Sequence, residues 1–250
     1  MKIITFLNLK GGCGKTSLAL GLLSACSVLG KKAVVVDFDP QQSITLLTKA
    51  EEKNTILDVL MDKCSVMDAV QHTSYGDIIP CSEKLIELAP QMVGKNITAL
   101  KEKLSDLECY DYVLIDCPPG ISGLPLSAVV ASNEVLIPTF ASMPVLYSIK
   151  KMKDTIDIVR TSYPEVKIRG IVLCNYEGWL LASKALTDVA TQMAGLIGTQ
   201  LLKTRIRRAT ALEQAYAMDK GICQYAGSSG IAYDFLSLAK ELGVIDNGKL

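Results

Sequence analysis

The sequence predicts an α/β fold in which a mostly parallel sheet carries helices on both faces. Two observations lead to this prediction. Short apolar runs rich in β-branched residues alternate along the chain with longer segments of helical periodicity. Buried strands separated by helices are typical of a parallel sheet whose two faces are both covered.

The expected strands and helices alternate from the first residues to the last. Strands are expected at residues 2–7, 33–37, 76–80, 112–116, 134–138 and 168–174, with a further short strand at 201–202. Helices are expected at residues 16–29, 84–107, 124–131, 145–162, 180–194 and 231–242. Ligands of such folds bind beyond the carboxyl ends of the strands, so the residues that follow each strand are the first candidates for a site.

Length and composition limit the possible classes of protein. The chain has 250 residues, of which 49% are hydrophobic and 21% charged, which suits a folded domain and excludes a disordered chain. No repeat or linker divides it, so residues 1–250 are expected to form one domain without an N-terminal helix-turn-helix. Lys+Arg and Asp+Glu both count 26, so any affinity for nucleic acid must come from a local, salt-sensitive patch.

The cysteines and the apolar segments indicate a cytoplasmic protein. The eight cysteines include no C-x-x-C pair, so reduced thiols are expected rather than a metal or iron–sulfur site. The first residues run straight into a glycine-rich loop, which leaves no room for a signal peptide. No stretch has the character of a membrane span.

The glycine-rich loop lies between the first expected strand and the first expected helix. It reads Lys10-Gly11-Gly12-Cys13-Gly14-Lys15-Thr16-Ser17. Its glycines allow successive backbone N–H groups to curve around phosphates, and the helix that follows points its N-terminus at their charge. Lys15 would neutralise the β- and γ-phosphates, Thr16 would ligate Mg²⁺, and Ser17 would reach the α-phosphate. The loop therefore predicts a P-loop NTPase that binds ATP and Mg²⁺.

One departure from the standard loop is informative. Leu9 stands where the usual pattern has its first glycine, and Lys10 comes directly before the double glycine. This arrangement resembles the signature of the ParA/MinD family of deviant Walker ATPases. The resemblance implies that Lys10 reaches the nucleotide, in many members across a dimer interface, and assists catalysis together with Lys15.

Three aspartates lie at or just beyond the ends of expected strands. Asp37 and Asp39 occur in Val36-Asp37-Phe38-Asp39-Pro40-Gln41, which resembles the second motif of the family. By this resemblance Asp37 helps to hold the hydration shell of Mg²⁺, and Asp39 orients or deprotonates the attacking water. Asp116 ends an apolar run in the manner of a Walker B strand and would bind Mg²⁺ through water, coupled to a switch loop at residues 117–123.

The resemblance extends over nearly the whole chain. Residues 77–85, 135–138 and 145–160 are similar to further segments of ParA proteins, and residues 170–175 resemble the strand before their adenine-contacting region. Asn175 would then be either a contact to the base or a simple turn residue.

A basic stretch near the end of the chain is the candidate DNA-binding surface. Residues 199–221 contain five basic and two acidic side chains and include Arg205, Arg207 and Arg208. They form either a solvated loop and helix cap or a patch that contacts phosphates and is doubled in a dimer. Related chromosomal proteins carry a basic residue just after the turn at Tyr176, where this chain has Glu177, and Lys184 is the candidate replacement.

The sequence thus favours a ParA-like partition ATPase. An ATP-dependent homodimer would bind double-stranded DNA non-specifically on the nucleoid, and a ParB-like partner would stimulate hydrolysis and release. Two alternatives remain: a MinD-like positioning ATPase that acts on a protein cargo or a membrane, and a small-molecule ATP-dependent synthetase. The helix at residues 231–242 has only Lys240 as a basic residue, so binding to a membrane is not expected.

Overall fold

An eight-stranded sheet forms the centre of the protein. The computed structural model describes residues 1–140, 143–178 and 181–245, without the side chains of residues 95, 143–148, 181–184 and 186. The strands are β1 Lys2–Phe6, β2 Ala33–Asp37, β3 Gln71–Thr73, β4 Gly76–Ile79, β5 Tyr112–Asp116, β6 Glu134–Thr139, β7 Lys167–Tyr176 and β8 Leu201–Arg207. Their order is β3-β4-β2-β5-β1-β6-β7-β8, and every pair is parallel except β3 with β4. The predicted mostly parallel sheet is confirmed.

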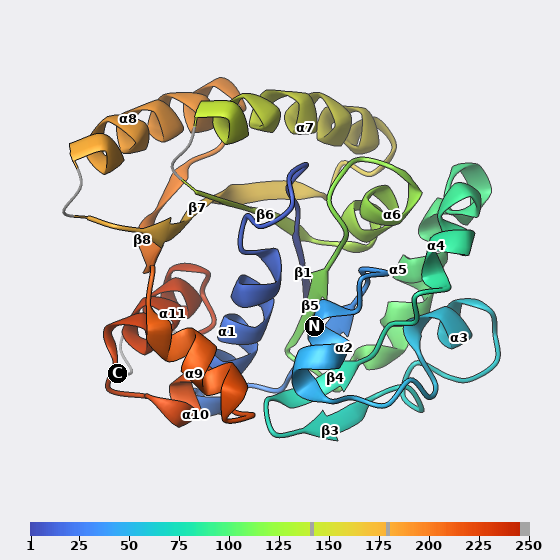
Figure 1. Ribbon diagram of the computed structural model, residues 1–250. Helices are drawn as coiled ribbons and strands as arrows, with labels where there is room; N and C mark the ends of the chain where they lie inside the picture. Colours follow the sequence, from blue (N-terminus) through green and yellow to red (C-terminus); the bar gives the residue numbers. More distant parts are fainter. Residues whose placement is uncertain (141–142, 179–180, 246–250) are drawn as a thin grey trace.

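Helices pack against both faces of this sheet (Figure 1). The longer ones are α1 Lys15–Val28, α6 Gly123–Ala131, α7 Met143–Ser162, α8 Leu181–Leu196, α9 Thr210–Ala217 and α11 Gly230–Glu241. The shorter ones are α2 Ser43–Thr48, α3 Ile56–Leu60, α4 Leu85–Leu88, α5 Ala99–Leu104 and α10 Ile222–Tyr225, with 3-10 turns η1 Ala89–Gln91, η2 Gly94–Thr98 and η3 Ser105–Leu107. None of the described helices is long and apolar enough to cross a membrane.

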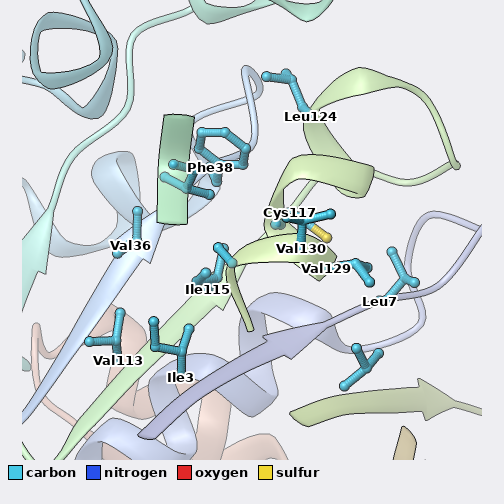
Figure 2. Packing of buried hydrophobic residues seen from close by; sticks show 14 of the residues in the cluster. Ile3, Leu7, Val36, Phe38, Val113, Ile115, Cys117, Leu124, Val129 and Val130 are labelled. Carbon is cyan, nitrogen blue, oxygen red and sulfur yellow. The ribbon is translucent and has the colours of Figure 1, made fainter. Parts of the chain in front are cut away.

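The continuous apolar runs of the strands supply two separate cores. Side chains of successive strand residues point to opposite faces, so Val34 and Val36 belong to one core and Val35 to the other. One core lies between the sheet and α5 to α8, and Figure 2 shows part of it around β1, β2, β5 and α6. The second core lies between the sheet and α1, α9, α10 and α11. This explains why the strand sequences show no alternation between apolar and polar residues.

The prediction of a single helix at residues 84–107 is wrong. The segment is divided into α4, η1, η2, α5 and η3. Pro90 lies in η1 and has no N–H to donate to a continuing helix, and Gly94 has a left-handed φ of 57°. The other expected helices are present with ends shifted by at most two residues, and β8 extends well beyond the predicted residues 201–202.

The outer edge of β8 is covered by two carboxylates from α11. Glu241 accepts hydrogen bonds from the backbone N–H groups of Lys203 and Thr204, at 2.7 and 2.8 Å. Asp234, seven residues earlier on the same helix, accepts one from the N–H of Arg207 at 3.0 Å. These three backbone donors of β8 are therefore bound to side chains rather than left for another strand.

Candidate nucleotide-binding site

Three neighbouring strands bring the predicted site residues to one edge of the sheet. β5 lies between β2 and β1, and Asp116 at its end is in register with Asp37 of β2 and with Phe6 of β1. The glycine-rich loop leaves β1 at the same edge. Because the three strands are parallel, residues separated by about a hundred positions in the sequence meet around one loop.

The conformation of the loop explains two of its glycines. Gly12 and Gly14 have φ values of 72° and 92°, a region that residues with a Cβ atom rarely adopt. A Cβ on Gly14 would also lie 3.2 Å from the Cβ and Sγ atoms of Cys174 on β7. Gly11 is exposed, and Cys13 is buried. The loop can therefore present backbone N–H groups outward while its Cys13 side chain packs inward.

The base of the loop is held by a residue that the sequence reading overlooked. Asn8 is fully buried, and its Nδ2 donates to the carbonyl of Pro138 at 2.7 Å, while its Oδ1 accepts from the N–H of Lys10 at 3.1 Å. Asn8 thereby links the loop to the end of β6. A polar residue in an otherwise apolar strand exit was the available signal in the sequence.

The N-terminus of α1 is suited to an anion. The helix begins at Lys15, has no side-chain cap and carries no acidic residue in its first turn. Lys15 is only 7% exposed and forms no ion pair with the described residues. A buried ammonium group beside uncapped N–H groups leaves a concentrated positive potential, which phosphates would compensate.

Thr16 and Asp116 provide oxygen atoms of the kind that Mg²⁺ requires. The Thr16 hydroxyl donates to Oδ2 of Asp116 at 2.6 Å. Asp116 is 1% exposed, and its Oδ1 has no hydrogen-bond partner in the described part of the chain. Burial raises the pKa of Asp116 to about 7, although the hydrogen bond from Thr16 lowers it. An unsatisfied buried carboxylate next to a hydroxyl fits a hydrated Mg²⁺ ion, which would stabilise the charged form.

Asp37 has a different environment from the one that the sequence suggests. Its Oδ2 accepts hydrogen bonds from both the N–H and the hydroxyl of Thr45, at 2.8 and 2.7 Å. The same hydroxyl accepts from the N–H of Cys81 at 2.9 Å. Burial raises the pKa of Asp37 to about 6 despite these hydrogen bonds. Asp37 thus caps α2 from the end of β2, and its assignment to the Mg²⁺ hydration shell stays a prediction.

Asp39 faces the cleft that opens beside the loop. Its Oδ1 accepts from the N–H of Gln41 at 3.0 Å, and both residues line the cleft. The cleft has a volume of about 820 Å³, within the usual range for ligand sites. Its lining includes Gly11, Gly12, Gly14, Lys15, Thr16, Ser17, Asn175, Arg207, Arg208 and Tyr216. Asn175, with a left-handed φ of 50°, is exposed at the end of β7 and lies in the wall formed by β7 and β8.

The three candidate DNA-binding arginines all have partners within the chain. The Arg205 guanidinium lies 4.7 Å from the centre of the Tyr176 ring, and its Nη1 donates to the hydroxyl of the same residue at 2.9 Å. Arg207 binds Asp234 through Nε and Nη2, at 2.7 and 2.8 Å. The side chain of Lys184 lies outside the described residues.

Arg208 is held most loosely of the three. Its Nη1 lies 3.3 Å from Oε1 of Glu177, and 74% of its side chain is exposed. It precedes the start of α9 at Thr210. Whether these arginines act on DNA stays a prediction, but their contacts within the chain differ in how readily they would open for a phosphate.

Known proteins are similar to this chain in sequence and in fold. Residues 1–168 match a protein family described as an AAA domain. The chain is 31% identical over 241 residues to the chromosome-partitioning ATPase Soj of Thermus thermophilus, covering 96% of this chain and 94% of the relative. The cell division ATPase MinD of Pyrococcus furiosus has a similar structure, with a TM-score of 0.79 and 25% identity over 97% of this chain and 98% of its own. Cobyrinic acid a,c-diamide synthase from Mycobacterium smegmatis, solved with ADP and magnesium, is 22% identical with a TM-score of 0.83, covering 100% of this chain and 97% of its own, and shares the fold.

Proposed function

The chain belongs to the ParA/Soj-like group of deviant Walker P-loop ATPases, which hydrolyse ATP with Mg²⁺, and from this premise we propose that it is a DNA-partition ATPase that dimerises on binding ATP. The observation that carries the proposal is the group formed by Lys15, Thr16 and Asp116 at the N-terminus of α1. In this group a buried cation, a hydroxyl and an unsatisfied carboxylate converge where a triphosphate would lie.

Each residue of the site has a role that its position supports. Lys15 and the N–H groups of the loop would bind the β- and γ-phosphates and oppose the charge that develops between them. Magnesium, when bound, neutralises the same phosphate oxygens, and Thr16 and Asp116 would hold it. Asp39 would orient the attacking water, because its carboxylate is fixed by Gln41 and borders the cleft.

Lys10 supports the dimeric form of the proposal. Its side chain is exposed at the mouth of the loop and forms no ion pair with any residue whose side chain is described. Lys10 is therefore free to approach a nucleotide held by a second copy of the chain. Its charge near the γ-phosphate would favour the dimer with ATP over the dimer with ADP.

Binding of DNA would use the arginines at the end of β8. The net charge is zero, so the attraction must be local and sensitive to salt. Arg208 is the first candidate because its ion pair is exposed and weak, so a phosphate can replace Glu177. Arg207 is bound at two points to the nearly buried Asp234, and Arg205 is stacked on Tyr176, so both would contribute less. A ParB-like partner would stimulate hydrolysis and release the protein from the nucleoid.

Retention of DNA in each nucleotide state tests the proposal. Non-specific duplex DNA should be retained with ATP and lost with ADP, and each phosphate contact should add roughly 0.9 to the slope of log affinity against log salt. Arg208→Ala should flatten this slope. Lys101→Ala, which removes another exposed ion pair with Glu165, is the matched control and should leave the slope unchanged.

Absence of DNA binding by the ATP-loaded wild type would contradict the DNA part of the proposal. Sedimentation with liposomes and pull-down of a protein cargo would then separate the positioning alternatives. Turnover that depends on a metabolite, without an ATP-driven dimer, would instead identify a small-molecule synthetase.

A further inference from the structure

A tyrosine hydroxyl in the nucleotide cleft has no hydrogen-bond partner among the residues that the structure describes. Tyr216 lies on α9, near the end of the helix, and its side chain is partly exposed. Its hydroxyl oxygen is nevertheless buried and forms no hydrogen bond with the residues that the structure describes. Leaving a buried hydroxyl unsatisfied costs about 1–3 kcal/mol. A group of this kind inside a ligand cleft indicates a hydrogen bond that is completed by the ligand.

The hydroxyl faces the first turn of α1. Both Tyr216 and Ser17 line the cleft. Burial raises the pKa of Tyr216 to about 12, a hydrogen-bonding approach of the Ser17 side chain lowers it, and Tyr75 and Asp116 raise it further. The approach of Ser17 does not meet the distance and angles of a formed hydrogen bond. The two hydroxyls are thus close neighbours without hydrogen-bond geometry, and Tyr216 stays protonated, as a donor, at neutral pH.

The ring of Tyr216 is held in place from behind. The ring of Tyr75 lies 6.4 Å away between centroids, and the Tyr75 hydroxyl donates to the Tyr216 carbonyl at 3.3 Å. Tyr75 is 1% exposed and is not one of the described residues that line the cleft. A donor on a supported ring loses little conformational entropy when a ligand arrives.

The position of Ser17 identifies the part of the nucleotide that lies nearest. Lys15, Thr16 and Ser17 are the first three residues of α1. Lys15 and Thr16 serve the β- and γ-phosphates and Mg²⁺, which leaves the α-phosphate beside Ser17. We propose that the Tyr216 hydroxyl donates a hydrogen bond to a non-bridging oxygen of the α-phosphate. This inference rests on the nucleotide site of the proposed function.

The α-phosphate is common to ATP and ADP, and this gives Tyr216 a recognisable signature. A contact made equally with both nucleotides strengthens binding without favouring hydrolysis or the ATP dimer. Tyr216 is therefore a binding residue that does not sense the γ-phosphate, in contrast to Lys10. Loss of its hydroxyl should affect affinity and leave the rate at saturating ATP unchanged.

The test compares Tyr216→Phe with Tyr75→Phe by isothermal titration calorimetry. Hydrogen bonds to charged groups contribute about 1.5–3 kcal/mol, so Tyr216→Phe should weaken ADP and ATP binding to a similar extent, by about 10- to 100-fold. The nucleotide-free variant should melt at the wild-type temperature or above, because an unsatisfied hydroxyl has been removed. Tyr75→Phe, which loses a hydrogen bond to the same helix, should bind both nucleotides as the wild type does.

Nucleotides with sulfur on the α-phosphate locate the contact. The wild type should distinguish the Rp and Sp diastereomers of ADPαS, because sulfur accepts hydrogen bonds poorly, and Tyr216→Phe should lose most of that distinction. Weaker binding with the distinction retained would place the contact elsewhere on the nucleotide and overturn the proposal. Unchanged affinity of Tyr216→Phe would overturn it as well. A wild type that binds neither ADP nor ATP would instead overturn the nucleotide site itself.

Discussion

The hydroxyl of Thr16 donates a 2.6 Å hydrogen bond to Oδ2 of Asp116, which joins the first turn of α1 to the end of β5. The bond occupies one carboxylate oxygen and leaves the other buried and unsatisfied within the described residues. The pair is therefore arranged for an ion and strained without one, because a buried carboxylate with a single hydrogen bond is costly.

Asp116→Asn should stabilise the nucleotide-free protein while it abolishes Mg²⁺-dependent ATP binding. Burial raises the pKa of Asp116 from 3.8 to about 7, so its ionisation destabilises the folded state increasingly as the pH rises between these values. The gain should be about 1–3 kcal/mol above pH 7 and should disappear near pH 4. Thermal unfolding without Mg²⁺ at several pH values measures it. An equal gain at all pH values would contradict the argument.

Two substitutions compare the contribution of Asp37 to stability with that of its hydrogen-bonding partner, Thr45. Asp37→Ala leaves the Thr45 N–H and hydroxyl without their acceptor and should destabilise the protein by about 2–4 kcal/mol. Thr45→Val keeps the N–H bond and should cost about half as much. Urea unfolding measures both variants.

The Mg²⁺ requirement of the ATPase separates two roles of Asp37. If the Mg²⁺ concentration that the ATPase requires rises in Asp37→Ala but not in Thr45→Val, the predicted place of Asp37 in the hydration shell is supported. Equal requirements in the two variants would contradict that role and leave Asp37 as the cap of α2.

Asp39→Ala should bind ATP and dimerise but stall before hydrolysis. A group that only orients or activates water contributes to the transition state, and its loss should lower turnover by roughly 10²–10⁴-fold. Equilibrium binding of ATP and single-turnover hydrolysis check the two halves of this expectation. If the variant failed to bind ATP, Asp39 would belong with the residues that hold the metal.

Lys10→Ala should separate ADP binding from assembly. Affinity for ADP should be nearly unchanged, because Lys15 and the amides of the loop remain. ATP-driven dimerisation and hydrolysis should be lost, since the exposed Lys10 is the residue expected to reach across to the partner's nucleotide. Light scattering with each nucleotide provides the measurement. A normal dimer with wild-type turnover would remove Lys10 from the mechanism.

Sequence patterns predicted the parts of the fold that depend on local information. The bounds of β2 and β5 were predicted to the residue, because a short apolar run of branched residues that ends in an aspartate is rarely anything other than a buried strand. The short helix α2 was missed because its cap is not local in sequence. The N–H of Thr45, in its first turn, is bound by Asp37, eight positions earlier. The hairpin strand β3 was missed because its three residues, Gln71–Thr73, carry no apolar signal.

The environment of the basic residues could not be read from sequence at all. Arg207 meets Asp234 across 27 positions, and Arg208 meets Glu177 across 31. Such pairs arise only when β7, β8 and α11 are packed together. For the same reason the sequence did not reveal Tyr216, whose unsatisfied hydroxyl becomes evident only when its side chain lies beside Ser17 in the folded cleft.

The carboxylates of Asp234 and Glu241 along β8 have a consequence for how copies of this protein can meet. Growth by strand addition would have to displace both acids from the backbone N–H groups that they bind, and the opposite edge offers only the three residues of β3. Both borders of the sheet thus resist the irreversible pairing that leads to aggregation. If the protein is the partition ATPase proposed above, its copies would meet through contacts other than strand addition, which nucleotide turnover could reverse.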